Sequence, residues 1–361
     1  MKQFWKSWKK VAVGVVGCLA LLVVGFITYL TITEYKPESI EEKGVIGNYS
    51  EEISLEETVS VVSYNMGYGC DGKESDFFMD GGKMVRPDSI EIVEKNMNGM
   101  IEVLQQLDTD VMFLQEIDTN SKRAYGINEV QQVYDIFSDT HSYAFGINYK
   151  TNYVPYPFHD NIGWVESGLM TLNSFEVTEA LRYNLPCSYS WPIRLMQLKR
   201  GLLVERVPLE DSDKEVVFVN LHLEAYAAGE KKEVQTKVLV DLLQGEYAKG
   251  NYVIAGGDFN QYFPGTNTEE IYPIYDADNY LPEEIEADML PEDWIWAIDL
   301  GTPSCRLLNE PYNPENEKTQ YYAIDGFILS PNVKVEKIET IDTQFAYSDH
   351  NPVRIEVSFE P

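Results

Sequence analysis

Acidic, amide and histidine side chains stand at the ends of apolar runs in this sequence, where together they could bind a metal ion and activate water. Asn65, Glu116, His222, Asp258 and Asn260 end such runs, whereas Asp325 lies inside one, and Asp349 and His350 lie just before the last one. In α/β sheets, ligands bind at the carboxyl ends of strands. A fold that brings these strand ends to one edge would therefore gather carboxylates, amides and two histidines in a single site.

The mixture of donor atoms favours a hard cation. Carboxylate and amide oxygens suit Mg²⁺, with Mn²⁺ as an alternative. The chain has only four cysteines and no HExxH spacing, which argues against a zinc site. It also lacks GxxxxGK[ST] and GxSxG, so a P-loop interpretation is excluded and the usual serine-hydrolase elbow is absent.

Each of these residues also has an ordinary structural explanation. Asp258 and Asn260 could form a turn, since both residue types favour turns. Glu116 could be an exposed strand end, His222 a half-buried histidine, and Asp325 a buried carboxylate with a backbone partner. The functional interpretation depends on the set occurring together.

The elements that would position these residues are strands alternating with helices. Strand-like runs lie at 59–64, 111–114, 216–221, 252–255, 322–329, 333–341 and 353–359. Apolar residues with helical spacing lie at 93–107 and 234–243. This alternation predicts a packed α/β domain, and about 300 residues can form one such domain. No repeat of fixed period is apparent.

The motifs S-Y-N-M, L-Q-E, N-L-H-L, G-G-D-F-N, I-D-G-F and S-D-H-N-P, in this order, resemble the endonuclease/exonuclease/phosphatase superfamily. That group includes deoxyribonucleases, inositol polyphosphate 5-phosphatases and neutral sphingomyelinases. The resemblance runs from about Val59 to Val357. It implies a four-layer α/β/β/α sandwich of two mixed sheets, which the strand–helix alternation alone does not distinguish from a doubly wound sheet.

The resemblance also implies a metal site. Glu116 corresponds to the principal Mg²⁺ carboxylate, with Asn65 beside it, and Asp349 to a further carboxylate of the metal site. Many members also place a catalytic Tyr or Arg before the central histidine motif. Spacing does not choose among the candidates Tyr149, Tyr153, Tyr156 and Arg200, and Arg306 could replace an Arg that is missing after Asn173–Ser174.

The remaining roles implied by the resemblance concern the attack on phosphorus. His350 corresponds to the general base or electrostatic partner, and Asp325 to the carboxylate that orients it. Asp258 and Asn260 correspond to the pair that positions the attacking water and a phosphate oxygen. His222 corresponds to a phosphate-binding or protonating histidine.

The N-terminus has the pattern of a membrane anchor. Residues 11–32 carry no charge and are long enough, at about 33 Å as a helix, to cross a bilayer core. Lysines precede this run, so residues 1–10 are expected to form a cytoplasmic tail and the rest of the chain to lie outside the cell. Residues 33–57 are polar and acidic and predict a tether, and residues 58–361 form the predicted catalytic domain.

Two other interpretations of the N-terminus remain open. A cleaved signal peptide would have a shorter apolar region and a small-residue cleavage site. A lipobox-like sequence ends at Cys18, but about 12 apolar residues follow it, which fits lipidation poorly.

The charge of the chain bears on its substrate. The formal net charge is -31, and the part after residue 10 carries 24 basic against 59 acidic residues. Residues 262–293 add an acidic insertion without Lys or Arg, which is either a solvated loop or a rim of the site. This excess of acidic residues argues against loose, charge-driven binding to nucleic acid or to an anionic membrane surface.

The sequence therefore predicts a membrane-anchored, monomeric phosphoesterase that prefers a lipid-linked or small phosphoester. An extracellular surface nuclease is an alternative, since nucleic acid is not excluded. A non-catalytic binding module on the same fold is the alternative of another class.

Overall fold

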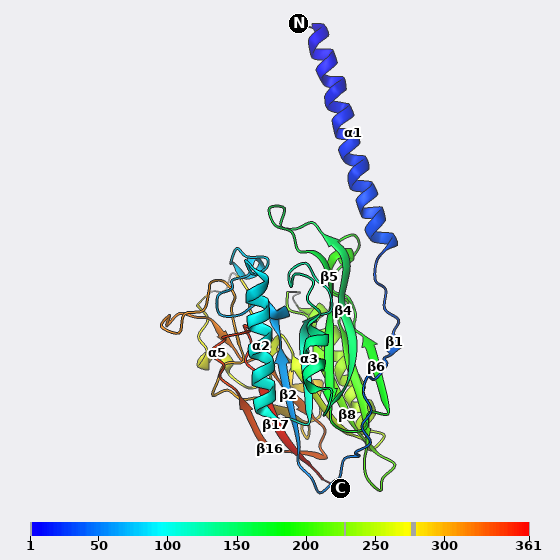
Figure 1. The fold of residues 1–361 in the computed structure, drawn as a ribbon, viewed down its shortest axis with the longest axis vertical. Coiled ribbons are helices and arrows are strands. Elements are labelled where there is room, and N and C mark those ends of the chain that lie inside the picture. Colours follow the sequence, from blue (N-terminus) through cyan, green and yellow to red (C-terminus); the bar gives the residue numbers. More distant parts are fainter. Residues whose placement is uncertain (1, 227–228, 276–278, 361) are drawn as a thin grey trace.

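Two β-sheets pack face to face, and helices cover both outer faces (Figure 1). The computed structural model describes residues 2–226, 229–275 and 279–360. One sheet has six strands in the order β16-β17-β2-β3-β5-β4, and the other has seven in the order β1-β6-β7-β8-β9-β15-β12. Parallel and antiparallel pairs occur in both. The predicted four-layer sandwich of mixed sheets is confirmed.

The helices in the described part of the chain are α1 (Lys2–Ile32), α2 (Ile90–Leu107), α3 (Glu129–Phe137), α4 (Glu230–Tyr247) and the short α5 (Thr268–Ile271). Single 3-10 turns are η1 (Gly67–Gly69), η2 (Phe78–Asp80), η3 (Ile193–Met196) and η4 (Ala287–Met289). The six-stranded sheet consists of β2 (Val59–Asn65), β3 (Val111–Asp118), β4 (Ser142–Val154), β5 (Gly163–Asn173), β16 (Val333–Thr340) and β17 (Val353–Phe359). The seven-stranded sheet consists of β1 (Ile40–Glu42), β6 (Glu179–Asn184), β7 (Gly201–Pro208), β8 (Glu215–His222), β9 (Tyr252–Asp258), β12 (Ile295–Ala297) and β15 (Asp325–Leu329). Two small pairs join β10 (Gln261–Tyr262) to β11 (Glu283–Glu284) and β13 (Cys305–Arg306) to β14 (Tyr321–Tyr322).

Alternation of side chains along the strands builds the layers. In β2 and β3, Val61 and Phe113 point between the sheets, where the Phe113 ring lies 6.3 Å from that of Phe218 in β8. The neighbouring residues Val62 and Met112 point outward and pack beneath α2 and α3. The helix α4 covers the opposite sheet. Both faces of the central strands are thus buried, which explains their nearly continuous apolar sequences.

Strand register brings the predicted site residues to one edge. The parallel pair β2–β3 aligns Asn65 with the residue before Glu116. The parallel pair β8–β9 aligns His222 with Asp258, and the antiparallel pair β9–β15 aligns Asp258 with Asp325. The three strands β8, β9 and β15 therefore present a row of polar side chains at the same end of the sandwich.

Gly257 allows β8 and β9 to approach closely just before Asp258. A Cβ atom built there would lie 1.9 Å from the backbone oxygen of Leu221. Gly257→Ala is therefore expected to destabilise the fold by about 1–3 kcal/mol and to lower activity by displacing Asp258. Thermal unfolding and initial rates measure both effects. Gly245→Ala is the control, since its Cβ would have no neighbour within 4 Å and alanine favours the helix α4. A Gly257→Ala protein with unchanged Tm would contradict this account.

The N-terminal helix α1 projects from the domain (Figure 1). Its segment Trp8–Ile32 is long and apolar enough to cross a membrane, with a mean hydropathy of 2.7. A signal sequence near an N-terminus would satisfy the same criteria.

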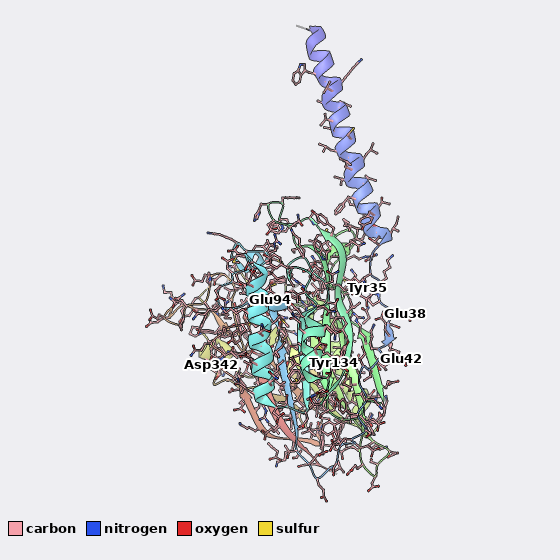
Figure 2. The ribbon with its side chains drawn as sticks, viewed as in Figure 1. Tyr35, Glu38, Glu42, Glu94, Tyr134 and Asp342 are labelled. Atoms are coloured by element: carbon pink, nitrogen blue, oxygen red, sulfur yellow. The ribbon has the colours of Figure 1, made fainter. Side chains whose placement is uncertain are left out.

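The segment expected as a tether runs along the edge of the domain, where Tyr35, Glu38 and Glu42 lie (Figure 2). Within it, β1 pairs antiparallel with β6. Farther along, Ile53 is fully buried in the core between the sheets and forms a bridge to Leu209. An acidic composition does not prevent edge pairing, because the strand is held by backbone hydrogen bonds rather than by apolar side chains.

Candidate active site

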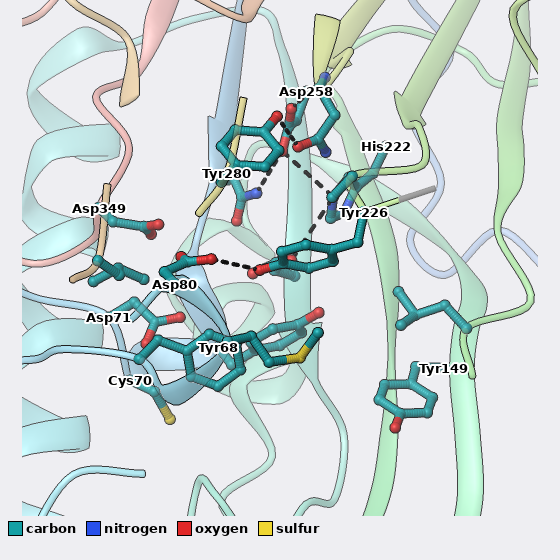
Figure 3. Close-up of a pocket in the computed structure, with 18 of the residues that line it drawn as sticks. Tyr68, Cys70, Asp71, Asp80, Tyr149, His222, Tyr226, Asp258, Tyr280 and Asp349 are labelled. Carbon is teal, nitrogen blue, oxygen red and sulfur yellow. Dashed lines mark hydrogen bonds and ion pairs between the residues drawn. The ribbon is translucent and has the colours of Figure 1, made fainter. Parts of the chain in front are cut away.

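The eight candidate residues meet at the edge where strands of both sheets end. Seven of them line one cavity of about 470 Å³. Figure 3 shows His222, Asp258 and Asp349 around this cavity. The eighth residue, Asp325, is buried behind His350. The structure thus brings all eight residues to one region: five at or near the carboxyl ends of strands, Asp325 at the start of β15, and Asp349 and His350 before β17.

His350 and Asp325 form a hydrogen-bonded pair. Nδ1 of His350 donates to Oδ2 of Asp325 at 2.9 Å, and the Ser304 hydroxyl donates to the same carboxylate oxygen at 2.7 Å. This arrangement fixes the imidazole and directs its Nε2 toward the cavity. Burial alone would lower the pKa of His350, but the Asp325 carboxylate raises that pKa well above its ordinary value.

Asp258 connects the two histidines. Its Oδ2 lies 3.4 Å from Nε2 of His222 and 3.9 Å from Nε2 of His350, and it accepts a hydrogen bond from the Asn65 amide at 3.1 Å. Burial, followed by repulsion from Asp325, raises the pKa of Asp258 to about 6. Burial, Arg200 and His350 lower the pKa of His222 well below its ordinary value. The surroundings therefore favour the protonated form of His350 and the neutral form of His222.

Asn260 is held in a strained backbone conformation, with φ of 52°. Its side-chain amide donates to the Leu223 carbonyl at 3.1 Å, and its backbone N–H donates to Asp258 at 2.8 Å. The Tyr280 hydroxyl donates to its side-chain oxygen at 2.6 Å. Because each hydrogen bond fixes a different atom, Asn260 is a preorganised group at the cavity wall.

Glu116 also has a positive φ, 52°, in a non-glycine residue. It lies within an irregularity in the β3–β5 pairing between Leu114 and Ile117, and such irregularities redirect side chains. Its Oε1 lies 3.7 Å from Nε2 of His222. Burial, followed by repulsion from Asp349, raises the pKa of Glu116 to about 7.

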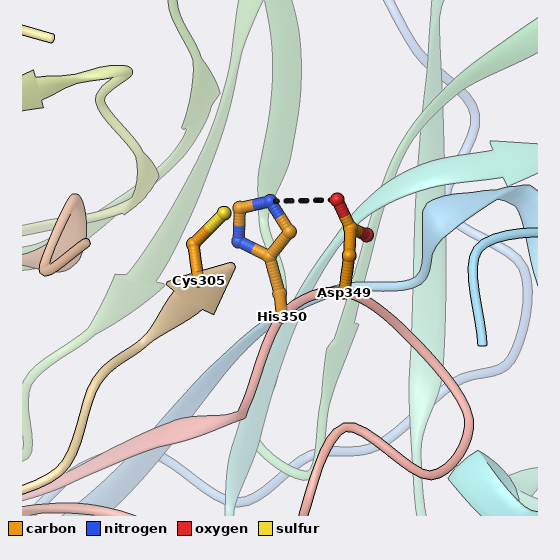
Figure 4. Close-up of side chains that lie close together, drawn as sticks. All are labelled: Cys305, Asp349 and His350. Carbon is orange, nitrogen blue, oxygen red and sulfur yellow. Dashed lines mark ion pairs between the residues drawn. The ribbon is translucent and has the colours of Figure 1, made fainter. Parts of the chain in front are cut away.

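The carboxylates of the cavity fit a divalent cation. Burial raises the pKa of Asp349, as it does that of Glu116, so the two negative charges are under-compensated in the protein alone. A divalent cation would relieve this repulsion. Among the described residues, two groups have possible ligand atoms within 4.8 Å of one another: Asp258, Asp325 and His350, and Cys305, Asp349 and His350. Figure 4 shows the second group. His350 belongs to both groups, and Glu116 belongs to neither.

Several residues of the cavity were not predicted. The Tyr226 hydroxyl donates to Asp80 at 2.9 Å, and burial raises the pKa of Asp80 to about 7. Tyr280 comes from the acidic insertion, which therefore contributes to the cavity wall. Asp80, Tyr226 and Tyr280 lie outside the regular strands, so no strand end signalled them. The positive-φ glycines of the segment around η1 and η2 were the available hint.

The Tyr and Arg candidates separate in the structure. Tyr149, Tyr156, Arg200 and Arg306 line the cavity, whereas Tyr153 packs against Phe26 of α1. Arg200 donates to the His222 carbonyl at 3.2 Å. Arg306 is buried and donates to the carbonyls of residues 72, 75, 307 and 310, so it braces loops. Trp294 packs in the core beneath α4, and Trp296 is partly buried against the same cluster.

Comparison with known proteins gives a family. A sequence model of the Endonuclease/Exonuclease/phosphatase family matches residues 63–350. A search of curated proteins gives no match.

Solved structures share the fold at low identity. An endonuclease/exonuclease/phosphatase from Beutenbergia cavernae is 14% identical, with a TM-score of 0.56 over 84% of this chain and 72% of that one. A protein described in the same words from Bacteroides vulgatus is 15% identical, with a TM-score of 0.53 over 84% of this chain and 100% of that one. An endonuclease/exonuclease/phosphatase family protein from Bacteroides thetaiotaomicron is 16% identical, with a TM-score of 0.50 over 84% and 99%. The family match spans nearly the whole domain, and the chain belongs to the endonuclease/exonuclease/phosphatase family.

Proposed function

We propose that this chain is a membrane-anchored, metal-dependent phosphoesterase that hydrolyses a phosphodiester or phosphomonoester by attack of water. One observation carries the proposal: the His350–Asp325 pair, Asp258 and His222 converge with Glu116 and Asn65 on a single cavity. Phosphoryl transfer needs a positioned nucleophile, neutralised oxygens and a stabilised leaving oxygen. Members of the family are generally metal-dependent phosphoesterases, which supports the same reaction class.

Glu116, Asn65 and Asp349 would hold the metal. Carboxylate and amide oxygens are the donors that Mg²⁺ prefers, with Mn²⁺ as an alternative. When bound, such an ion supplies charge stabilisation at a phosphoryl oxygen. The Asn65 side-chain oxygen already accepts a hydrogen bond from Gly67 N–H at 3.0 Å, which fixes its direction.

The protein groups would divide the rest of the work. Asp258, at 3.4 Å from His222, would orient the attacking water and accept its hydrogen bond. His350 would hold a phosphoryl oxygen or move a proton at Nε2, while Asp325 keeps its Nδ1 protonated. Three hydrogen bonds fix Asn260 at the cavity wall, where it would bind a phosphate oxygen. Positioned proton-transfer groups each contribute about 10²- to 10⁴-fold.

The substrate we favour is a lipid-linked or small phosphoester rather than duplex DNA. A duplex carries one charge per about 1.7 Å, and proteins meet it with Lys and Arg. Here the domain is strongly acidic, and Arg200 and Arg306 are buried on backbone carbonyls.

A substrate screen tests the proposal. The full-length protein is assayed with phospholipid vesicles, an inositol phosphate and duplex DNA at equal Mg²⁺ and salt, each with and without EDTA. We expect EDTA-sensitive hydrolysis of a lipid or small phosphoester, with lower kcat/KM on DNA. Efficient DNA cleavage that falls steeply with salt would instead identify a nuclease, and no EDTA-sensitive release from any substrate would contradict the proposed chemistry.

The proposed topology places the N-terminus in the cytoplasm and the domain outside the cell, at the cell membrane. The four lysines before residue 11 and the absence of acids before Glu34 support this orientation. Protease added to intact cells is then expected to degrade the domain, whereas a cytoplasmic marker protein survives. Protection of the domain until the cells are lysed would reverse the orientation.

A further inference from the structure

The cavity has an apolar end that the reaction at phosphorus does not use. Four side chains form it, and we call them the apolar arm: Val154, Ile162, Met196 and Leu198. Val154 and Ile162 come from the β4–β5 hairpin, and Met196 and Leu198 from η3 and the residues after it. The Tyr149 hydroxyl donates to the Met196 carbonyl at 2.9 Å and joins the two segments. A site for a small, fully polar phosphoester would have no need of such a wall.

The same two segments carry large apolar side chains on the surface. Four of them form what we call the aromatic rim: Tyr156, Phe158, Trp191 and Ile193. Phe158 is 87% exposed, and the other three are 52–57% exposed. Ring contacts link the rim to the cavity, since Phe78 in the cavity wall lies 5.6 Å from Tyr156, which lies 6.1 Å from Phe158. Clustered exposed side chains of this kind mark an interaction surface.

The rim lies beside the end of α1. The Tyr153 ring lies 6.1 Å from that of Phe26, and the Trp191 indole donates to the Thr31 hydroxyl at 3.2 Å. The Glu34 carboxylate, 4% exposed, accepts from Arg194 at 3.1 Å and lies 3.5 Å from the Lys199 ammonium. These contacts hold the helix end against the hairpin and the η3 segment, which also carry the apolar arm of the cavity. Figure 1 shows the β4–β5 hairpin rising to the level of the last turns of α1.

Helix geometry sets the depth of the rim if α1 crosses a bilayer. The 25-residue segment is about 37 Å long, against a hydrocarbon thickness of about 30 Å. Ile32 would then lie in the headgroup layer. Phe26 lies six residues earlier, about 9 Å farther along the axis, so its partner Tyr153 would lie close to the boundary between headgroups and acyl chains. Tyr and Trp side chains favour that layer, as do apolar groups that enter it by about 5–10 Å.

We propose that the aromatic rim docks on the bilayer that α1 crosses, and that the cavity draws from it an amphiphilic phosphoester. The phosphate lies at His350 and the hydrocarbon group lies along the apolar arm. In the reaction, the water oxygen forms a new bond to phosphorus, the P–O bond to the leaving alcohol breaks, and a proton from the water ends on that alcohol. This inference rests on the proposed function for the reactive end of the cavity.

Two chromogenic phosphodiesters test the apolar arm: p-nitrophenyl dodecyl phosphate and p-nitrophenyl ethyl phosphate. The full-length protein is assayed with each in phosphatidylcholine nanodiscs with Mg²⁺. We expect a kcat/KM ratio of at least about tenfold in favour of the dodecyl ester, since each buried methylene adds several-fold in binding. Leu198→Asn should narrow that ratio. Each ester partitions into lipid to the same extent in the assays of the native protein and of Leu198→Asn. A difference in the kcat/KM ratio between the two proteins therefore reflects the contact of the dodecyl chain with the cavity wall.

The rim is tested separately. Phe158→Ser combined with Ile193→Ser should slow turnover of the bilayer-embedded dodecyl ester by about tenfold and leave the soluble ethyl ester unaffected. Ile136→Ser on α3 is the control, since Ile136 is 49% exposed but belongs to neither the hairpin nor the η3 segment. As a readout without catalysis, brominated phosphatidylcholine should quench Trp191, measured as the difference between the native protein and Trp191→Phe.

The outcomes distinguish the two levels of the proposal. Equal kcat/KM for the two esters, or no quenching of Trp191, would overturn the inference and leave the phosphoesterase intact. An unquenched rim would point to a protein partner for this surface. Failure to hydrolyse either ester with any divalent metal would overturn the inference, and the same failure on every substrate of the screen would also remove the proposed function.

Discussion

Replacing His350 by alanine is expected to lower kcat/KM on a phosphoester by about 10²- to 10⁴-fold, the effect of a positioned proton-transfer group. The imidazole is fixed by the 2.9 Å hydrogen bond to Asp325, and its Nε2 faces the carboxylates of Asp258 and Asp349 at 3.9 Å. Removing the ring leaves His222 in the cavity, but its Nε2 contacts Asp258 at 3.4 Å and has no contact with Asp325 among the described ion pairs. The measurement is steady-state hydrolysis at saturating Mg²⁺.

Asp325 is expected to act only through His350. Asp325→Asn removes the charge that favours the protonated ring but keeps the shape of the side chain, so it should cost less than His350→Ala. In the double variant the losses should not multiply, because residues that act as a unit are non-additive. Circular dichroism and Tm control for misfolding, since Asp325 is buried. Losses that multiply in His350→Ala/Asp325→Asn would contradict a functional pair.

Glu116→Gln is expected to raise the Mg²⁺ concentration needed for half-maximal activity by at least about 10- to 100-fold. Removing a group that only orients a metal ligand typically weakens metal binding by this factor, and Glu116 is proposed as a ligand itself. The substitution keeps the shape and removes the charge that a hard cation prefers. It also relieves the repulsion between Glu116 and Asp349. The variant should therefore be at least as thermally stable as the native protein without metal, and gain less stability when Mg²⁺ is added.

Metal titrations followed by activity and by Tm measure both effects. Glu94→Gln is the matched control, because Glu94 is an exposed acid on α2 (Figure 2). An identical Mg²⁺ dependence in Glu116→Gln and Glu94→Gln would remove Glu116 from the metal site. Activity that survives EDTA in the native protein would remove the metal itself.

Much of the site followed from the sequence because strands fix geometry. A run such as Val217–His222 predicts a buried strand, and neighbouring strand ends meet at a common edge. The register pairs His222 with Asp258, which is the contact that the strand-end rule anticipates. Asp325 begins β15 and reaches the same edge because that strand is antiparallel to β9. The family resemblance supplied what this rule does not, namely that the sheets are two and that they pack face to face.

The rest of the site depends on contacts that no periodicity encodes. Tyr280 reaches Asn260 from an acidic insertion, and Tyr226 meets Asp80 across 146 residues of sequence. Loops of this kind have neither a period of 2 nor one of 3.6, so their direction is set only by the packing of the finished domain. The strand β1 escaped notice for a different reason, since two of its three side chains are acidic and it is held by backbone pairing.

The pairing of β1 with β6 determines where the chain can be shortened from its N-terminus without exposing a sheet edge. If the polypeptide began at residue 58, β6 would become the bare edge of the seven-stranded sheet, with its N–H and C=O groups free to pair with another molecule. The same cut would remove Ile53 and leave a void between the sheets. A cut after Ile32 removes only α1 and keeps both the edge and the core covered. The residues before Val59 thus cover the sheet edge and fill the core, and we expect a soluble form of the domain to aggregate less when it retains them.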